Sequence, residues 1–335
     1  MKKLLYFLLI TAVFAVTSCS KSGLTQRDRL VGLVLAGDTL QMYIGETRQL
    51  PLTINPSNYH VDSLKWLSSD TTILKISNTG LLTAKKMGLS TVSVTNLSGS
   101  ISVNAKVTVT DSLNYGLIAF YPFNNTPNDL SGHNYNGVAH NVTAVSDRFG
   151  NANGAYAFAG DSGSYVSVVD HPALRLYQED FSINVWVNLA AYNQSIGSHI
   201  VSKRTNQVNS GYTYSVNGYG YGYPLGVQGF GEGGGSNNAV SLTGIALNQW
   251  HMLTVTFSPN DNKITFYKDG VADGTTAFTT SPANSTATMY FGKDTPLQPT
   301  TYFWQGAMSE VRIYGRKLRP GEITKLYLAT STVLQ

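Results

Sequence analysis

The chain has 335 residues, of which 42% are hydrophobic and only 13% charged, about half of the roughly 25% charged share of ordinary soluble proteins. This length favours two domains. The formal net charge is +4, but Lys2 and Lys3 lie in a segment expected to be removed, which leaves 21 basic residues against 19 acidic ones. Because Lys and Arg also form no cluster beyond isolated pairs, nucleic acid is excluded as a partner.

The first residues have the organisation of an export signal. Two lysines precede an apolar run, Leu4 to Val16, which is too short to cross a bilayer as a stable helix. The run ends in VTSC, which resembles the lipobox of bacterial lipoproteins. The resemblance implies that Cys19 is lipidated and becomes the first mature residue. An ordinary signal peptide with a chance cysteine nearby is the alternative.

Cys19 is the only cysteine of the chain, so the exported protein has no disulfide and its one thiol stands where lipidation requires it. Several acyl chains on one residue would anchor it stably. By resemblance to lipoprotein sorting, Ser20 in place of Asp implies the outer membrane, on either its periplasmic or its surface face. We expect residues 1–19 to be the signal peptide with its lipobox and 20–27 a tether. The lipid is then the sole contact with the membrane of the cell envelope.

Residues 28–110 have the pattern of a small β-sandwich, with short β-rich runs, turn residues between them and no helical period. Leu40, Met42 and Ile44 are expected on one face of a strand, and Trp66 in the core. The order GET…INP…WLSSD…ILKISNTGLLTAKKMGLSTVSV resembles the bacterial Ig-like domain of group 2. That resemblance implies a spacer or adhesive stalk with no chemistry of its own.

Residues 111–115 read as a short linker, and residues 116–330 as a second β-domain. Its many short strands, separated by turn residues, predict a two-sheet sandwich or jelly roll. Asp269-Gly270 in KITFYKDGVADG predicts a tight hairpin. FSINVWV carries apolar side chains on both faces, which predicts a strand covered on both sides. RPGEITKLY is predicted to be the only helix after the signal peptide.

Five segments of this second domain, in order, resemble the laminin-G-like jelly roll of the concanavalin A-like lectin/glucanase superfamily. They are GLIAFYPFNN…DLSGHNYNG, YAFAGDSGSYVSV, FSINVWVN, NQWHMLTVTFSPNDNKITFYKDGVADG and FWQGAMSEVRIYGRKLRPGEITKLY. The predicted fold class is all-β, with an N-terminal Ig-like sandwich and a C-terminal concanavalin A-like jelly roll. The fold carries lectins, adhesion modules and hydrolases alike, so it does not decide the function.

No catalytic constellation is evident in the sequence. Glucanases of this fold use carboxylates that flank the scissile bond, but no two of the five glutamates alternate on a strand. Glu179 and Asp180 are adjacent and are expected on opposite faces of a strand. Neither a Gly-x-Ser-x-Gly elbow nor a His-Glu-x-x-His zinc motif occurs. We therefore predict no catalytic residue and a protein that is not an enzyme.

Calcium is the metal that the composition favours, because Asp, Asn and loop carbonyls supply oxygen ligands. The family resemblance implies that Asp129 and Glu310 are ligands. Ser309 departs from the family, which usually has aspartate there. The alternative is that Asp129 begins a turn by binding its own backbone and that Glu310 is a solvated or ion-paired strand residue.

Residues 217–238, NGYGYGYPLGVQGFGEGGGSNN, combine tyrosine with glycine. GFGEGG has the GxGxxG spelling, but no helix follows it, so a dinucleotide site is excluded. We expect Tyr219, Tyr221, Tyr223 and Phe230 to contact a ligand, since aromatic faces suit sugars. The expected function is a cell-envelope lipoprotein with a non-catalytic module that binds a glycan or a cell-surface protein. The alternatives are a glucanase-type glycoside hydrolase and a protein-binding structural or adhesion subunit.

Overall fold

The structure is a computed structural model that describes residues 30–59, 64–193, 197–205, 210–217, 224–232, 239–277, 282–295 and 302–329. The chain divides into two compact units, Met1–Asp111 and Ser112–Gln335. The boundary falls inside the segment 111–115 that the sequence predicts as a linker. Each unit has a hydrophobic core of its own.

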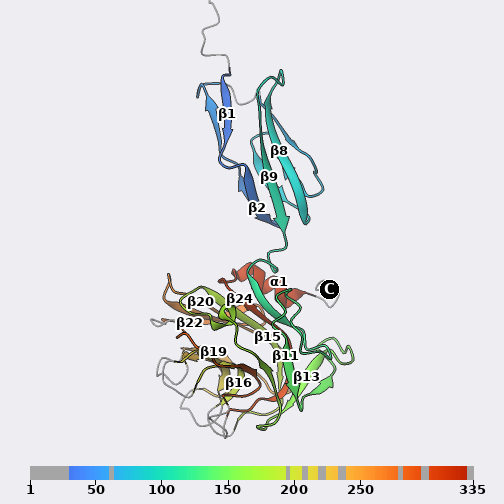
Figure 1. Cartoon of the computed structure of the whole chain (residues 1–335), viewed down its shortest axis with the longest axis vertical. Coiled ribbons are helices and arrows are strands. Elements are labelled where there is room, and N and C mark those ends of the chain that lie inside the picture. The colour runs from blue at the N-terminus through green and yellow to red at the C-terminus, as the bar shows by residue number, and fades with distance from the viewer. Residues whose placement is uncertain are drawn as a thin grey trace, which may run out of the picture. The chain divides into compact units, whose positions relative to one another are not determined.

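The first unit is a small β-sandwich. Its strands are β1 (Gly32–Leu35), β2 (Thr39–Tyr43), β3 (Thr47–Gln49), β4 (Leu52–Asn55), β5 (Leu64–Ser68), β6 (Leu74–Ile76), β7 (Leu81–Ala84), β8 (Gly88–Asn96) and β9 (Ser102–Thr110). They form sheets of order β2-β9-β8-β5, β3-β7-β6 and β1-β4. Figure 1 shows β2, β9 and β8 side by side. The pair β2 and β9 is parallel, whereas β8 pairs antiparallel with both of its neighbours.

The core of the first unit follows the predicted strand faces with one exception. Met42 is fully buried, and Leu40 and Trp66 pack against the same core. Gly80 lies under the Trp66 ring, where an added Cβ would come within 2.9 Å of it, and its φ of +82° also favours glycine. Ile44 lies beyond the end of β2 and is 36% exposed. It does not share the buried face, because the alternation of side chains ends with the strand.

The second unit is the predicted jelly roll of two sheets. One has the order β12-β13-β24-β15-β20-β21-β22, with β10 also paired to β24, and the other has the order β11-β14-β23-β16-β17-β18-β19. The strands are β10 (Leu117–Tyr121), β11 (Gly137–His140), β12 (Thr143–Val145), β13 (Ala155–Ala159), β14 (Tyr165–Val168), β15 (Phe181–Leu189), β16 (Gly197–Lys203), β17 (Tyr212–Asn217), β18 (Val227–Glu232), β19 (Ala239–Gly244), β20 (Trp250–Ser258), β21 (Lys263–Lys268), β22 (Val271–Ala277), β23 (Met289–Phe291) and β24 (Gln305–Tyr314).

The two sheets enclose one large core, and a second, smaller core covers the outer face of the eight-stranded sheet. Strand β15 contributes Ile183, Val185 and Val187 to the large core and Trp186 to the small one. The prediction that this strand is covered on both sides is confirmed. The predicted hairpin is also confirmed, because Asp269 and Gly270 join β21 to β22 with φ of 52° and 81°, which are the positive values that a type I′ turn requires.

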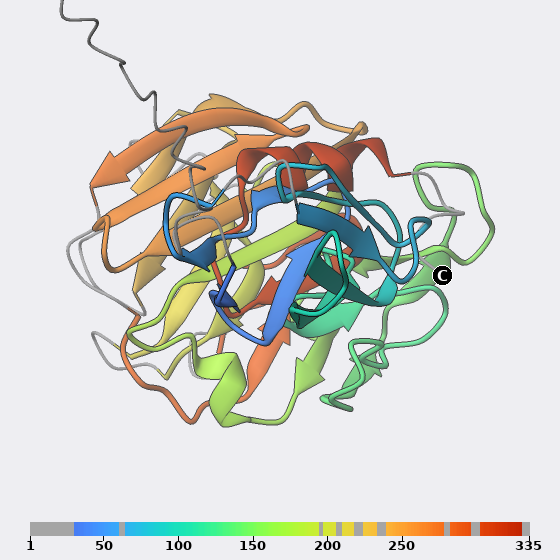
Figure 2. The same ribbon diagram turned by 90° about the horizontal axis from the view of Figure 1, so that it is seen from above.

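The smaller core lies under the helix α1 (Pro320–Leu328), the one α-helix among the described residues. Ile323 and Leu326 are buried, and Tyr327 stacks on Trp186 of the sheet. The Glu322 carboxylate accepts a 2.9 Å hydrogen bond from the Arg319 backbone N–H, which satisfies a free donor at the helix start. Figures 1 and 2 show α1, in red, beside the strands of the eight-stranded sheet.

The part of the chain that the structure describes has no helix both long and apolar enough to span a membrane.

Candidate functional site

Four of the predicted site residues lie outside the described residues. They are the lipidation candidate Cys19 and the three tyrosines Tyr219, Tyr221 and Tyr223. Phe230, the fourth predicted ligand contact, is described and is only 1% exposed. Its ring packs on Phe181 and Tyr212 inside the large core. The structure therefore places Phe230 in the core instead of on a ligand surface, because its inward position on β18 faces the opposite sheet.

Asp129 is 5% exposed, and its carboxylate accepts hydrogen bonds from its own loop and from strand β10. Oδ1 accepts hydrogen bonds from the backbone N–H of Phe120 and Ser131, at 2.8 and 2.9 Å. Oδ2 accepts from the backbone N–H of Tyr135 and the hydroxyl of Ser131, at 3.1 and 2.9 Å. This arrangement matches the turn-forming alternative.

Glu310 lies on β24 with a left-handed backbone, φ 50°. Its carboxylate forms ion pairs with Arg148 and Arg312, so it matches the ion-paired alternative. Among the described residues, no group of three or more His, Cys, Asp or Glu side chains could hold a metal ion.

A groove of about 390 Å³ opens at one end of the jelly roll, where the start of β10, the end of β24 and the loop after β14 meet. Its volume lies within the range of ordinary small-ligand sites. We call it the η3 groove, after the short 3₁₀ helix η3 (Pro172–Arg175) that forms one wall. Its lining residues are Ile118, Pro172, Ala173, Arg175, Leu176, Tyr177, Glu179, Asp180, Asn284 and Gly315.

The wall of the η3 groove is shaped by local sequence. Pro172 begins η3, and the His171 ring accepts a 3.3 Å hydrogen bond from the Ala173 backbone N–H. Leu176 and Gln178 both have left-handed backbones, with φ of 51° and 56°. Such a conformation costs about 1 kcal/mol or more for a non-glycine residue. Burying a leucine side chain contributes about 2 kcal/mol, and Leu176 is only 4% exposed, so its burial offsets the strain.

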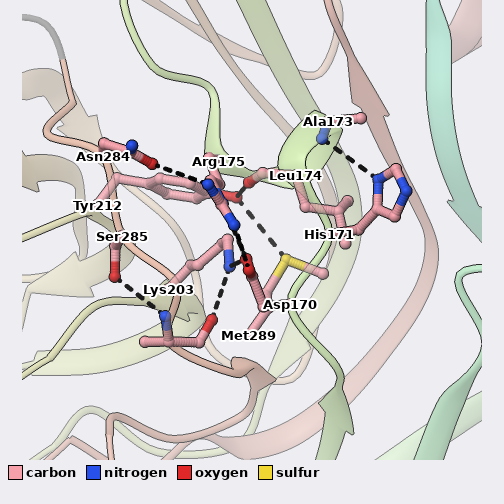
Figure 3. A network of polar contacts seen from close by, with 11 residues as sticks. Asp170, His171, Ala173, Leu174, Arg175, Lys203, Tyr212, Asn284, Ser285 and Met289 are labelled. Atoms are coloured by element: carbon pink, nitrogen blue, oxygen red, sulfur yellow. Dashed lines mark hydrogen bonds and ion pairs between the residues drawn. The ribbon is translucent and has the colours of Figure 1, made fainter.

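An ion network behind the groove fixes this loop to the sheet (Figure 3). Asp170 accepts from Arg175 Nη2 at 2.7 Å and from Lys203 Nζ at 2.5 Å. Lys203 is 1% exposed and also donates to the Ala287 carbonyl at 2.6 Å. Hydrogen bonds from Arg175 and then Lys203 hold the pKa of Asp170 below its ordinary value. Burial lowers the pKa of Lys203, and Asp170 partly opposes this.

The η3 groove combines an aromatic side chain with hydrogen-bonding groups of both kinds. Tyr177 is 43% exposed, and among the described residues no other ring stacks on it. Arg175 and the Asn284 amide can donate, whereas the carboxylates of Glu179 and Asp180 only accept when ionised. A sugar has apolar C–H faces that suit an aromatic ring and hydroxyls that both donate and accept. The groove therefore has the chemistry of a carbohydrate site.

The two acidic residues of this groove do not lie where the sequence predicts them. Glu179 and Asp180 do not lie on opposite faces of a strand, because β15 begins only at Phe181. They belong to the preceding loop, and both line the same groove. The sequence reasoning also missed Arg175, Tyr177 and Asn284. RLYQED, with an aromatic residue among three charged ones before a buried strand, was an available signal for the first two, but nothing marks Asn284.

A second set of aromatic residues lies on the outer face of the seven-stranded sheet, but it is already paired. His140 stacks on Tyr165 with ring centroids 4.2 Å apart, and Lys293 Nζ lies 3.2 Å from the centroid of the same ring. These two contacts leave no face of Tyr165 for a sugar. The η3 groove is therefore the stronger candidate.

Fold and groove together define a class, an all-β protein with an Ig-like sandwich followed by a jelly roll that carries a ligand-sized groove. Family models match both parts. Residues 38–110 match the bacterial Ig-like domain (group 2), and residues 159–324 match the concanavalin A-like lectin/glucanases superfamily. A search among curated proteins found no match.

Solved structures similar to the chain include the binding domain of Paraclostridial Mosquitocidal Protein 1 (17% identity, TM-score 0.51). They also include the botulinum neurotoxin serotype D/C VPI 5993 binding domain (18%, 0.50). The alignment covers 64% of this chain and 52% of each toxin chain, so this chain spans about half of the length of these toxin domains.

A further similar structure is domain 4 of AbnA, an extracellular arabinanase from Geobacillus stearothermophilus, in complex with arabinotriose. Identity is 18% and the TM-score 0.50, over 63% of this chain and 98% of that one. At these identities the similarity shows the fold alone.

Proposed function

We propose that the jelly roll is a non-catalytic carbohydrate-binding module and that the η3 groove holds the glycan. The observation that carries this proposal is the exposed Tyr177 ring in one groove with the carboxylates of Glu179 and Asp180 and the donors of Arg175 and Asn284. The similar structure of domain 4 of AbnA, which is in complex with arabinotriose, supports a glycan ligand. A protein ligand on the same surface is the second candidate, supported by the toxin binding domains.

A glycan array followed by calorimetry on the purified protein tests the proposal. Tyr177→Ala should weaken binding of the best glycan at least tenfold, because aromatic contact supplies much of the affinity in such a site. Its melting temperature should stay nearly unchanged, since Tyr177 is 43% exposed and no other ring among the described residues stacks on it. Tyr115→Ala, which removes a tyrosine that is 47% exposed and outside the groove, is the matched control.

Two results would contradict the proposal. Wild-type affinity in Tyr177→Ala would remove the η3 groove from recognition. Release of reducing sugar from a bound polysaccharide, lost in Glu179→Gln or Asp180→Asn, would make the protein a glycoside hydrolase.

The N-terminal segment belongs to the same proposal. The protein would be a cell-envelope lipoprotein, anchored through lipid on Cys19, with the Ig-like domain as the spacer that precedes the binding module in the chain. Metabolic labelling with a radioactive fatty acid and membrane fractionation test this. Label and membrane association should both disappear in Cys19→Ser, and a labelled Cys19→Ser protein would refute the anchor.

Calcium at Asp129 and Glu310 stays a prediction. In the structure the Asp129 carboxylate already accepts hydrogen bonds from its own loop and from strand β10, and Glu310 is paired with two arginines, so calcium would have to displace protein donors. Melting curves in excess calcium and in EDTA test the prediction. A bound calcium raises the melting temperature with calcium concentration, and identical curves would contradict it.

Tyr219, Tyr221 and Tyr223 also stay a prediction for ligand contact. Changing all three to alanine should abolish glycan binding and leave thermal unfolding nearly unchanged. A large fall in melting temperature would instead identify them as core residues.

A further inference from the structure

The cationic side chains in and behind the η3 groove already form hydrogen bonds and ion pairs within the protein. Arg175 donates from Nε and Nη2 to the two oxygens of Asp170, at 3.3 and 2.7 Å, and from Nη1 to Asn284 Oδ1 at 3.4 Å. Lys203 lies behind the wall with 1% exposure, and its ammonium is held by Asp170 and the Ala287 carbonyl. Figure 3 shows both cations directed at the same carboxylate. A guanidinium held in this way cannot turn its fork to a ligand carboxylate.

The carboxylates that line the groove, unlike these cations, have no side-chain partner among the described residues. Glu179 is exposed and Asp180 half-buried, and within the described residues neither forms an ion pair or a side-chain hydrogen bond. They belong to the loop that carries Tyr177, so a ligand that contacts this ring also lies beside them. Five charged side chains lie in and behind the groove: Asp170, Arg175, Glu179, Asp180 and Lys203. The two without a partner among the described residues, Glu179 and Asp180, are both negative.

From this asymmetry we propose that the η3 groove selects neutral glycans and rejects acidic ones. The inference rests on the proposed function and names its ligand class. The hydroxyls of a neutral sugar can donate to Glu179 and Asp180 and accept from the N–H groups of the Asn284 amide. A uronate or sulfate group would meet two unpaired carboxylates with no free guanidinium, and like charges in contact are a common source of specificity.

The experiment compares two glycans with the same backbone, an oligogalacturonate and its fully methyl-esterified, neutral form of equal length, in calorimetry at low salt. The wild-type protein should bind the neutral chain at least tenfold more tightly. Glu179→Gln with Asp180→Asn should reduce this preference to about threefold or less, because the amides keep an acceptor oxygen and remove the negative charge. Asp38→Asn with Asp261→Asn is the control. It changes the net charge equally at two exposed positions outside the groove and should keep the full preference.

The outcomes separate the two proposals. Equal binding of both glycans by the wild-type protein, or a preference unchanged in the Glu179→Gln, Asp180→Asn variant, overturns the charge selection and leaves glycan binding intact. A control variant that loses the preference assigns it to overall net charge and overturns the inference as well. Binding of neither these two glycans nor any other glycan on the array overturns the proposed function and the selectivity with it.

Discussion

At the scale of single residues, the carboxylate of Asp294 is a buried charge held by several partners, and it is 2% exposed just after β23. It accepts from the Ser202 hydroxyl at 2.7 Å, from Arg204 Nε at 3.0 Å and from the Thr295 backbone N–H at 2.7 Å. His199 Nδ1 lies 3.7 Å from the same carboxylate. A buried charge is stable only when it is paired in this way.

We expect Asp294→Asn to lower the free energy of unfolding by about 3 kcal/mol, because the buried Arg204 loses its counter-charge. Urea unfolding followed by tryptophan fluorescence measures the change. Asp261→Asn, at an exposed ion pair, should have a much smaller effect on the free energy of unfolding. An equal loss in both variants would contradict the special role of burial.

The same carboxylate gives a pH dependence with a definite sign. Burial by itself would raise the pKa of Asp294, but the nearby charges of His199 and Arg204 and the hydrogen bonds from Arg204 outweigh it and hold the pKa well below the ordinary value of 3.8. As the pH falls, Asp294 is therefore protonated in the unfolded chain at a higher pH than in the folded protein. The stability that Asp294 contributes decreases as the pH falls below about 4. The difference in unfolding free energy between wild type and Asp294→Asn should shrink from pH 5 to pH 2. A difference that stays constant with pH would contradict a lowered pKa of Asp294 in the folded protein.

At the scale of elements, α1 stabilises the jelly roll by covering the outer face of β15 and its neighbours. Leu326 is 1% exposed within this small core, whereas Leu328 on the same helix is 68% exposed. Leu326→Ala should therefore cost about 2–5 kcal/mol of unfolding free energy, and Leu328→Ala less than about 0.5 kcal/mol. Chemical unfolding of the two variants compares them directly. Similar losses would mean that the helix does not depend on its buried face.

At the scale of the whole molecule, the two units have separate cores. Separate cores predict separate cooperative unfolding. The full chain should show two calorimetric transitions, and a fragment of residues 112–335 should reproduce one of them. Because every residue of the η3 groove lies in that fragment, its glycan affinity should match that of the full chain within about twofold. A single transition, or a fragment that does not bind, would show that the units depend on each other.

The strands and the two domains were predictable because they depend on local patterns. Alternating apolar residues, as in β15 and β21, predict the strand and its buried face, and Asp269-Gly270 predicts the turn. The same local reasoning failed for Glu179 and Asp180, because it assumed a strand where the chain forms a strained loop. It also treated Phe230 as exposed in a glycine-rich segment, although alternation along β18 turns its ring into the core.

The sequence by itself determined the all-β class, the order of the two domains and α1, the one α-helix among the described residues, since hydrophobic periodicity and turn residues act over a few neighbouring positions. Only the tertiary structure decided the candidate site. The η3 groove takes residues from 118 to 315, and Asp170, Arg175 and Lys203 become one network only when β16 lies beside the loop after β14. Such a site depends on which distant segments pack together, and no local pattern encodes that contact.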